Sequence, residues 1–84
     1  MDYLIYNNFK LLIKIKKYIM KDNIFYLEIT LSDMKAFDVW EKIKQNLNSI
    51  AYLYDGINNN DNVIFILKEC YINEDILILK GETE

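Results

Sequence analysis

Few residues in this 84-residue chain have the chemistry of a catalytic or metal-binding site. The sequence has no histidine and one cysteine, Cys70, so it offers no imidazole base, no Cys–His pair and no zinc-binding set. Cys70 lies in an apolar segment, which predicts a buried, inert thiol. Glu74 and Asp75 are adjacent carboxylates with no predicted apolar pocket to raise either pKa. The sequence therefore predicts a protein that is not an enzyme and holds no cofactor or metal ion.

One segment, 55–62, is rich in oxygen ligands and invites comparison with a calcium-binding loop. When the EF-hand pattern is started at Asp55, Asn60 falls where glycine is required and Ile66 where glutamate is required. The segment fails this pattern. We therefore expect a polar loop between two strands.

Charge is divided unevenly along the chain. Residues 1–48 hold 8 Lys and 6 acidic residues, whereas residues 49–84 hold 2 Lys and 7 acidic residues. An acidic surface suits a basic partner, because complementary charge speeds and selects the encounter. We expect a host protein or a protein–RNA complex to bind there. The candidate partner-binding residues are Asp55, Asp61, Glu69, Glu74 and Asp75.

An alternative reading is a small nucleic-acid-binding or regulatory module. Lys10, Lys14 and Lys16 would share one face of a strand, with Tyr18 and Tyr26 nearby for base stacking. The acidic overall balance and the absence of arginine, the residue best suited to bidentate phosphate contact, both disfavour direct binding of nucleic acid.

The elements that must position these residues are mostly strands, and the clearest exception is one amphipathic helix over residues 33–48. Ser32 is the expected N-cap, and Asp33 then falls in the first turn. The predicted buried stripe recurs every three to four residues and consists of Met34, Phe37, Trp40, Ile43 and Leu47.

The segment 24–31 alternates cleanly and predicts a strand, whereas residues 9–20 fit either a strand or a helix. A three-residue loop over 21–23, with Asn23 left-handed, favours the strand because apolar then faces apolar and charge faces opposite charge. The expected pairs are Ile13–Leu31, Lys14–Thr30, Ile15–Ile29, Lys16–Glu28, Tyr18–Tyr26 and Ile19–Phe25. Before this hairpin, the apolar run 2–6 ends at Asn7-Asn8, which predicts either a tight turn or a loop.

The sequence thus predicts a single α+β domain over residues 1–84, without internal repeats. Its fold would be an antiparallel or mixed sheet of about five strands with the helix packed on one face, in the order β-β-α-β-β-β. The segments 63–67 and 76–79 carry apolar residues at both odd and even positions, so both faces of each strand would be apolar. One helix cannot cover so much apolar surface. We expect loops, a second copy in a homodimer or another partner to cover the surplus.

Small size, net acidic charge, missing catalytic groups and a one-helix sheet together resemble a known type of protein. The chain is similar to the small inhibitors of bacterial defence systems that phages and mobile elements carry, of the anti-CRISPR kind. The resemblance implies a stoichiometric protein that binds and blocks a host machine. With no signal peptide and no stretch long enough to span a membrane, the expected location is the cytoplasm of a bacterial host.

Overall fold

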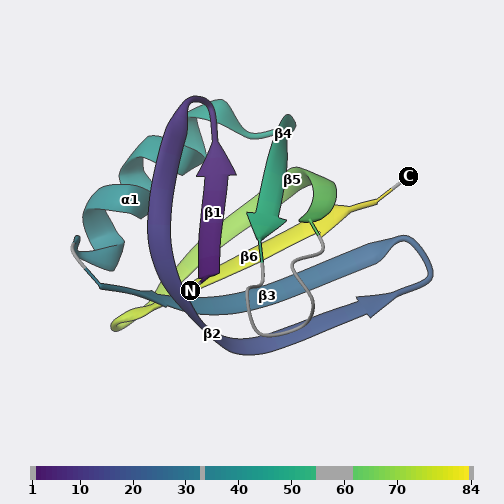
Figure 1. The fold of residues 1–84 in the computed structure, drawn as a ribbon. Coiled ribbons are helices and arrows are strands. Elements are labelled where there is room, and N and C mark those ends of the chain that lie inside the picture. The colour runs from purple at the N-terminus through teal and green to yellow at the C-terminus, as the bar shows by residue number, and fades with distance from the viewer. Residues whose placement is uncertain (1, 33, 55–61, 84) are drawn as a thin grey trace.

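The computed structural model describes residues 2–32, 34–54 and 62–83, which form a closed barrel of antiparallel strands (Figure 1). The order around the barrel is β1-β2-β3-β6-β5-β4, and β4 pairs with β1 to close it. Helix α1 (Ala36–Ile43) and a short 3-10 helix (Lys44–Asn46) connect β3 to β4. The strands are β1 (Asp2–Tyr6), β2 (Phe9–Lys21), β3 (Ile24–Leu31), β4 (Ser49–Tyr54), β5 (Asn62–Asn73) and β6 (Ile76–Glu82).

The predicted α+β fold, with its open sheet of about five strands, is wrong. Residues 2–6 form β1, which pairs with β2 on one side and with β4 on the other. The β1–β4 pairs run from Tyr3↔Tyr54 to Tyr6↔Ala51. Because this pairing joins the two ends of the sheet, the helix has no open sheet face to cover. Alternation along one segment predicts a strand but does not determine its neighbours, which is why closure could not be foreseen.

The β2–β3 hairpin agrees with the prediction at one end and departs from it at the turn. Its turn has two residues rather than three, since Lys21 pairs with Ile24, and Asp22 rather than Asn23 has a left-handed φ, 58°. A β-bulge between Ile15 and Lys17 takes up the residue that the shorter turn releases. The confirmed pairs are Ile13–Leu31, Lys14–Thr30 and Ile15–Ile29.

The bulge reverses which side chains face the barrel interior between the bulge and the turn. Tyr18 pairs with Leu27, packs against the core and lies with its ring centroid 5.3 Å from that of Phe25. Ile19 pairs with Tyr26 and is exposed. The predicted pairs Lys16–Glu28, Tyr18–Tyr26 and Ile19–Phe25 are therefore wrong.

The β5–β6 hairpin repeats the architecture of β2–β3. It has a two-residue turn that begins at Glu74, with φ of 56°, and a bulge between Leu67 and Glu69. The same chain separation relates Glu74 to Asp22 and Leu67 to Ile15, so the two hairpins are structural equivalents. No repeat is predicted from the sequence, because equivalent positions seldom share a residue type.

The barrel interior is filled by inward side chains from all of its strands. Phe25 of β3 and Phe65 of β5 stack inside it, with ring centroids 3.9 Å apart. Gly81 lies where β6 passes between β3 and β5, and a Cβ there would collide with the carbonyl oxygen of Ile66. The other large, fully buried side chains are Leu4, Leu27, Ile29, Leu53, Leu67, Leu77 and Leu79.

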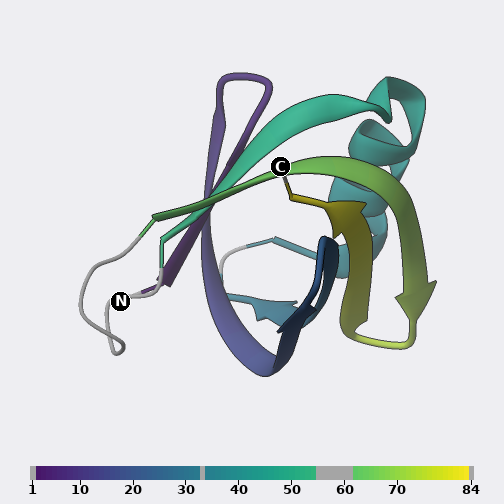
Figure 2. The same cartoon turned by 90° about the vertical axis from the view of Figure 1, so that its right-hand side faces the viewer.

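Helix α1 is shorter than the predicted helix over 33–48, and it buries a narrower stripe. It lies beside the barrel (Figure 2) and contacts β5 and β6. Its buried residues are Ala36, Val39 and Ile43. The predicted contacts of Trp40 and Leu47 with the core are confirmed, since both are partly buried against it.

The N-terminal part of the predicted helix is not helical. The N-cap of α1 is Lys35, which has an extended backbone and no capping side-chain hydrogen bond, so the predicted N-cap at Ser32 is wrong. Asp33 lies outside the described residues. Met34 and Phe37 are 42% and 50% exposed, so their predicted place in the buried stripe is also wrong. A helix of about two turns can bury only one narrow stripe, and Val39 and Ile43 of this stripe join the core cluster.

Candidate functional site

The outer surface of the barrel contains a continuous group of uncharged side chains. Strand alternation directs them outward from β1, β4 and the first half of β5. Four of these side chains, Ile5, Ile50, Tyr52 and Ile64, are between 37% and 55% exposed, which is unusual for large apolar residues that neighbour one another. We call this group the apolar face. It consists of Tyr3, Ile5, Ile50, Tyr52, Tyr54, Ile64 and Ile66.

The strand register places the members of the apolar face in adjacent rows. Ile5 pairs with Tyr52, which pairs in turn with Ile64, so one row crosses three strands. A second row runs from Ile50 to Ile66. Directly opposite residues in such rows lie about 4.5–5.5 Å apart at Cβ, close enough for their side chains to touch. The exposed side chains therefore form one surface rather than scattered contacts.

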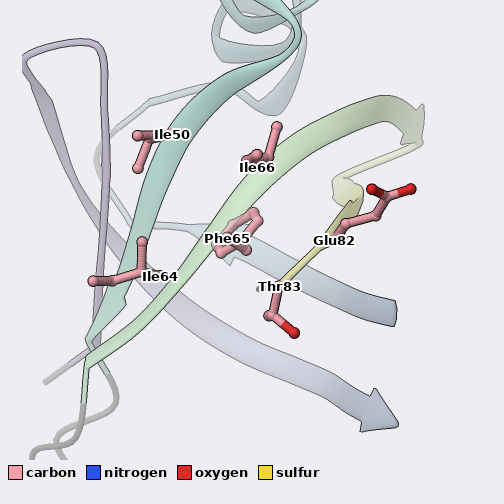
Figure 3. Close-up of a pocket in the computed structure, with 6 residues that line it drawn as sticks. All are labelled: Ile50, Ile64, Phe65, Ile66, Glu82 and Thr83. Atoms are coloured by element: carbon pink, nitrogen blue, oxygen red, sulfur yellow. The ribbon is translucent and has the colours of Figure 1, made fainter. Parts of the chain in front are cut away.

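Part of the apolar face is hollowed into an open groove of about 340 Å³ (Figure 3). Ile50 comes from β4, while Glu82, the last residue of β6, and Thr83, which follows it, supply the polar rim. The floor includes Phe65, whose ring is otherwise buried in the core. The complete lining is Ile50, Ile64, Phe65, Ile66, Glu82 and Thr83.

A second, smaller hollow lies at the opposite side of the apolar face, next to β2. Tyr3 and Tyr54 form a tilted aromatic pair with ring centroids 6.0 Å apart. The Lys10 ammonium lies 4.3 Å from the centroid of the Tyr3 ring, within the range of a cation–π contact. Together with Ile5 these residues line the hollow. A cation thus borders the apolar face at β2, whereas the Glu82 carboxylate borders it at β6.

Another part of the outer surface, on β3, β6 and the neighbouring stretches of β2 and β5, is polar, and its groups contact one another. The Tyr26 hydroxyl donates a hydrogen bond to a Glu28 carboxylate oxygen 2.5 Å away, and the Tyr71 hydroxyl donates to Glu69. These hydrogen bonds raise the pKa of both tyrosines above 10.0. The Lys80 ammonium lies 5.4 Å from the Tyr71 ring centroid. We call this group the charged face, defined by Lys17, Tyr26, Glu28, Glu69, Tyr71 and Lys80.

The structure does not unite the predicted acidic binding residues. Glu69 lies on the charged face directly opposite Lys80, so a cation interrupts the negative charge. Glu74 and Asp75 form the β5–β6 turn, where Asp75 lines a hollow that also includes Lys35. Asp55 and Asp61 lie outside the described residues. Among the described residues, the acidic groups are thus dispersed among lysines.

The predicted lysine stripe is exposed on β2 but is not accompanied by both predicted aromatic partners. Lys10 pairs with Ile5 beside the apolar face, Lys14 pairs with Thr30, and Lys16 lies at the bulge. Tyr18, predicted to lie beside them, packs inward against Phe25 instead. The orientation of Tyr18 was mispredicted because the predicted hairpin contained no bulge.

Cys70 is buried, as predicted, and its thiol is a weak acid. Burial raises the pKa of Cys70 from 9.0 to about 12, so the thiol is protonated at neutral pH. Its backbone carbonyl accepts a hydrogen bond of 3.0 Å from the Trp40 indole nitrogen. In the part of the chain that the structure describes, no three His, Cys, Asp or Glu side chains lie close enough together to hold a metal ion.

The residues of the apolar face were only partly indicated by the sequence. The surplus of apolar residues predicted at 63–67 is confirmed at Ile64, which is exposed. At 76–79 the outward residues Ile76 and Ile78 are half-buried, so that surplus is largely covered. Ile5, Ile50 and Tyr52 were missed, and the only signal available was apolar residues of both parities in their short strands.

Comparisons with protein-family models, with curated proteins and with solved structures found no match to this chain. Within residues 2–32, 34–54 and 62–83, no helix has the length and apolar character that crossing a membrane requires.

Proposed function

We propose that this chain is a non-enzymatic protein-binding inhibitor that docks on its partner through the apolar face. The observation that carries the proposal is the exposure of Ile5, Ile50, Tyr52 and Ile64 on adjoining strands, with no charged residue among them. Exposed apolar surfaces of this kind, with a polar border, are typical of protein interaction sites.

Each strand of the barrel has two neighbours, although residues 62–65 of β5 and residues 14–21 of β2 are paired along one edge alone. The apolar face consists of side chains that point outward from the sheet, so a partner that covers it contacts these side chains. Tyrosine and isoleucine bury much apolar area on such binding. Tyr52, at the middle of its row, is the expected energetic centre, because tyrosines near the middle of an interface contribute most to affinity.

Other classes of ligand fit this face less well. Nucleic acid requires a surface on which cations dominate. Among the described residues of the apolar face none is a cation, and the Lys10 ammonium beside it faces the Tyr3 ring. A catalytic role needs titratable or nucleophilic groups, and the chain has no histidine and a buried cysteine. The resemblance to phage-borne inhibitors supports a partner within a bacterial defence machine, blocked at one copy of this chain per site.

The proposal is tested by binding and inhibition with matched variants. The wild-type chain, Ile64→Lys and Ile19→Lys are each immobilised and exposed to lysate from a defence-competent bacterium. Ile19 is the matched control, because it is a similarly exposed isoleucine on β2 that lies outside the apolar face. We expect one protein or complex to bind the wild type and Ile19→Lys but not Ile64→Lys, and to lose activity at a 1:1 ratio. Equal binding by both variants would contradict the proposal.

A further inference from the structure

The border of the apolar face carries opposite charges on its two sides. On the β1 side the neighbouring strand is β2, where Lys10 lies directly opposite Ile5. On the β5 side the neighbouring strand is β6, where Glu82 lies directly opposite Ile66. The apolar face thus has a cation at one border and an anion at the other, with uncharged residues between them. This arrangement is complementary to itself after rotation by half a turn.

A two-fold axis converts this arrangement into matched contacts. Along this surface the strands follow the order β2, β1, β4, β5, β6, so a two-fold axis over β4 exchanges the β2 side of one barrel with the β6 side of another. Lys10 of each copy then lies on the side of Glu82 of the other. Tyr52 meets its counterpart at the middle, and Ile64 lies over β1 of the other copy. Two-fold dimers require such a self-complementary surface, and they are the commonest protein oligomers.

The closed barrels would meet face to face. The exposed side chains of the apolar face point outward from the sheet, so the two faces meet as packed layers rather than as one continuous sheet. Two sheets that pack face to face lie about 10 Å apart, with their strands inclined by about 30° and their side chains interdigitated. Isoleucine and tyrosine side chains of the apolar face are long enough to fill that distance.

The available area predicts a reversible association. A stable protein interface buries about 800 Å² on each partner. That would be about one seventh of this barrel's 5532 Å² of accessible surface. The apolar face, whose members are half-exposed rather than fully exposed, offers less than this, so the dimer should dissociate on dilution through the micromolar range.

We infer that a second copy of this chain covers the apolar face in solution, as a two-fold dimer in which Lys10 of each copy faces Glu82 of the other. The inference deepens the proposed function, because the dimer would cover the surface that the partner needs. Partner binding and self-association would then exclude one another. The dimer itself does not depend on the existence of that partner.

The test is sedimentation velocity on the full chain, from about 1 to about 200 μM at low salt, a range chosen to bracket a weak interface. We expect the wild type and Ile19→Lys to change from monomer to dimer across this range. Ile64→Lys and, independently, Ile50→Lys should stay monomeric, because each lysine would be buried in the interface. Circular dichroism and melting temperature establish that each variant is folded.

Charge reversal tests the orientation. Lys10→Glu and Glu82→Lys should each weaken the dimer about three-fold, the effect of an exposed ion pair, and the two changes together should restore it. Partner binding at fixed bait concentration should weaken as added free chain forms dimer. Three results would overturn the inference. The wild type could stay monomeric at every concentration, Ile64→Lys could dimerise with unchanged affinity, or the double variant could dimerise no more tightly than the single variants. A monomer that still captures its partner through Ile64 would leave the proposed function standing, whereas a dimer without a partner would remove that function alone.

Discussion

The apolar face and the charged face are built on the same backbone pattern and differ in what their side chains contact. On the charged face, Tyr26 and Tyr71 donate hydrogen bonds to neighbouring carboxylates, and Lys80 lies over the Tyr71 ring. On the apolar face, Ile50 and Ile64 expose more than half of their surface. The charged face is thus satisfied by its own neighbours and by water. The apolar face gains free energy only when another surface covers it.

The two faces also differ from the barrel interior in what they contribute to, because the interior determines stability and the outer faces determine binding. Both faces lie over one common interior, in which Phe25 beneath the charged face stacks on Phe65 beneath the apolar face. Outward side chains of either face add little to this interior. Substitutions inside the barrel should therefore affect both faces equally, whereas substitutions on the outside should affect binding alone.

The largest effect is expected inside the barrel, at Phe25→Ala. Removing a fully buried ring that stacks on Phe65 should lower the free energy of unfolding by about 3–5 kcal/mol, because a cavity remains in the interior. Urea denaturation measures the change, with Tyr26→Ala on the outer side of the same strand as control. If Phe25→Ala costs less than about 1 kcal/mol, the interior is not shared as described.

The second-largest effect is expected at alkaline pH, which should lower the stability of the barrel interior. The pKa of Cys70 is raised by burial from 9.0 to about 12, so the folded state holds its proton more tightly than the unfolded state. Stability is therefore complete below pH 9 and declines as pH rises toward 12. Burial also raises the pKa of Tyr6 and adds to the decline.

The measurement is the urea midpoint at pH 8 and pH 10.5, compared with Cys70→Ala. The variant should lose less stability over this interval. Uncharged substitutions of the isoleucines of the apolar face should keep the wild-type pH dependence, since they remove neither the thiol nor a tyrosine hydroxyl. An alkaline decline that is the same in Cys70→Ala would show that the thiol does not cause it.

On the apolar face, Ile64→Lys should change the free energy of unfolding by no more than about 0.5 kcal/mol, because the side chain already lies at the surface. The same variant should abolish self-association and partner binding. Thermal denaturation at 1 μM, where the chain should be monomeric, gives the stability. A loss above about 2 kcal/mol would place Ile64 in the monomer's core instead.

The smallest effect is expected on the charged face, at Tyr71→Phe. This change removes one solvent-exposed hydrogen bond to Glu69 and leaves the ring in place. We expect no measurable shift in the urea midpoint and no change in self-association. A weakened dimer would show that the interface extends onto the charged face and would break the distinction between the two surfaces.

Local patterns in the sequence predicted several elements correctly. Apolar alternation predicted β3, and charge and apolar matching predicted the pairs Ile13–Leu31 and Ile15–Ile29. The pairs nearer the turn were mispredicted, because a bulge at Lys16 and a shorter turn compensate for one another. Nothing local distinguishes that combination from a longer turn without a bulge, since both bring Ile15 opposite Ile29.

The candidate site was less accessible to sequence reasoning. The acidic residues were selected because they cluster along the chain, but Glu69 lies opposite Lys80 and the turn residues Glu74 and Asp75 lie elsewhere. Proximity along the chain is a poor guide to proximity on a barrel, because successive strands direct side chains to different parts of its circumference.

By itself, the sequence determined the burial of Cys70, the absence of histidine chemistry, the strand character of most of the chain and a surplus of apolar residues near Ile64. Only the tertiary structure decided that the barrel closes and that Ile5, Tyr52 and Ile64 adjoin. Alternation is a property of one segment and arises from the pleat of its own backbone. Which distant strands pair depends on the free energy of the whole barrel, so a surface made by three separate strands exists only once the fold is complete.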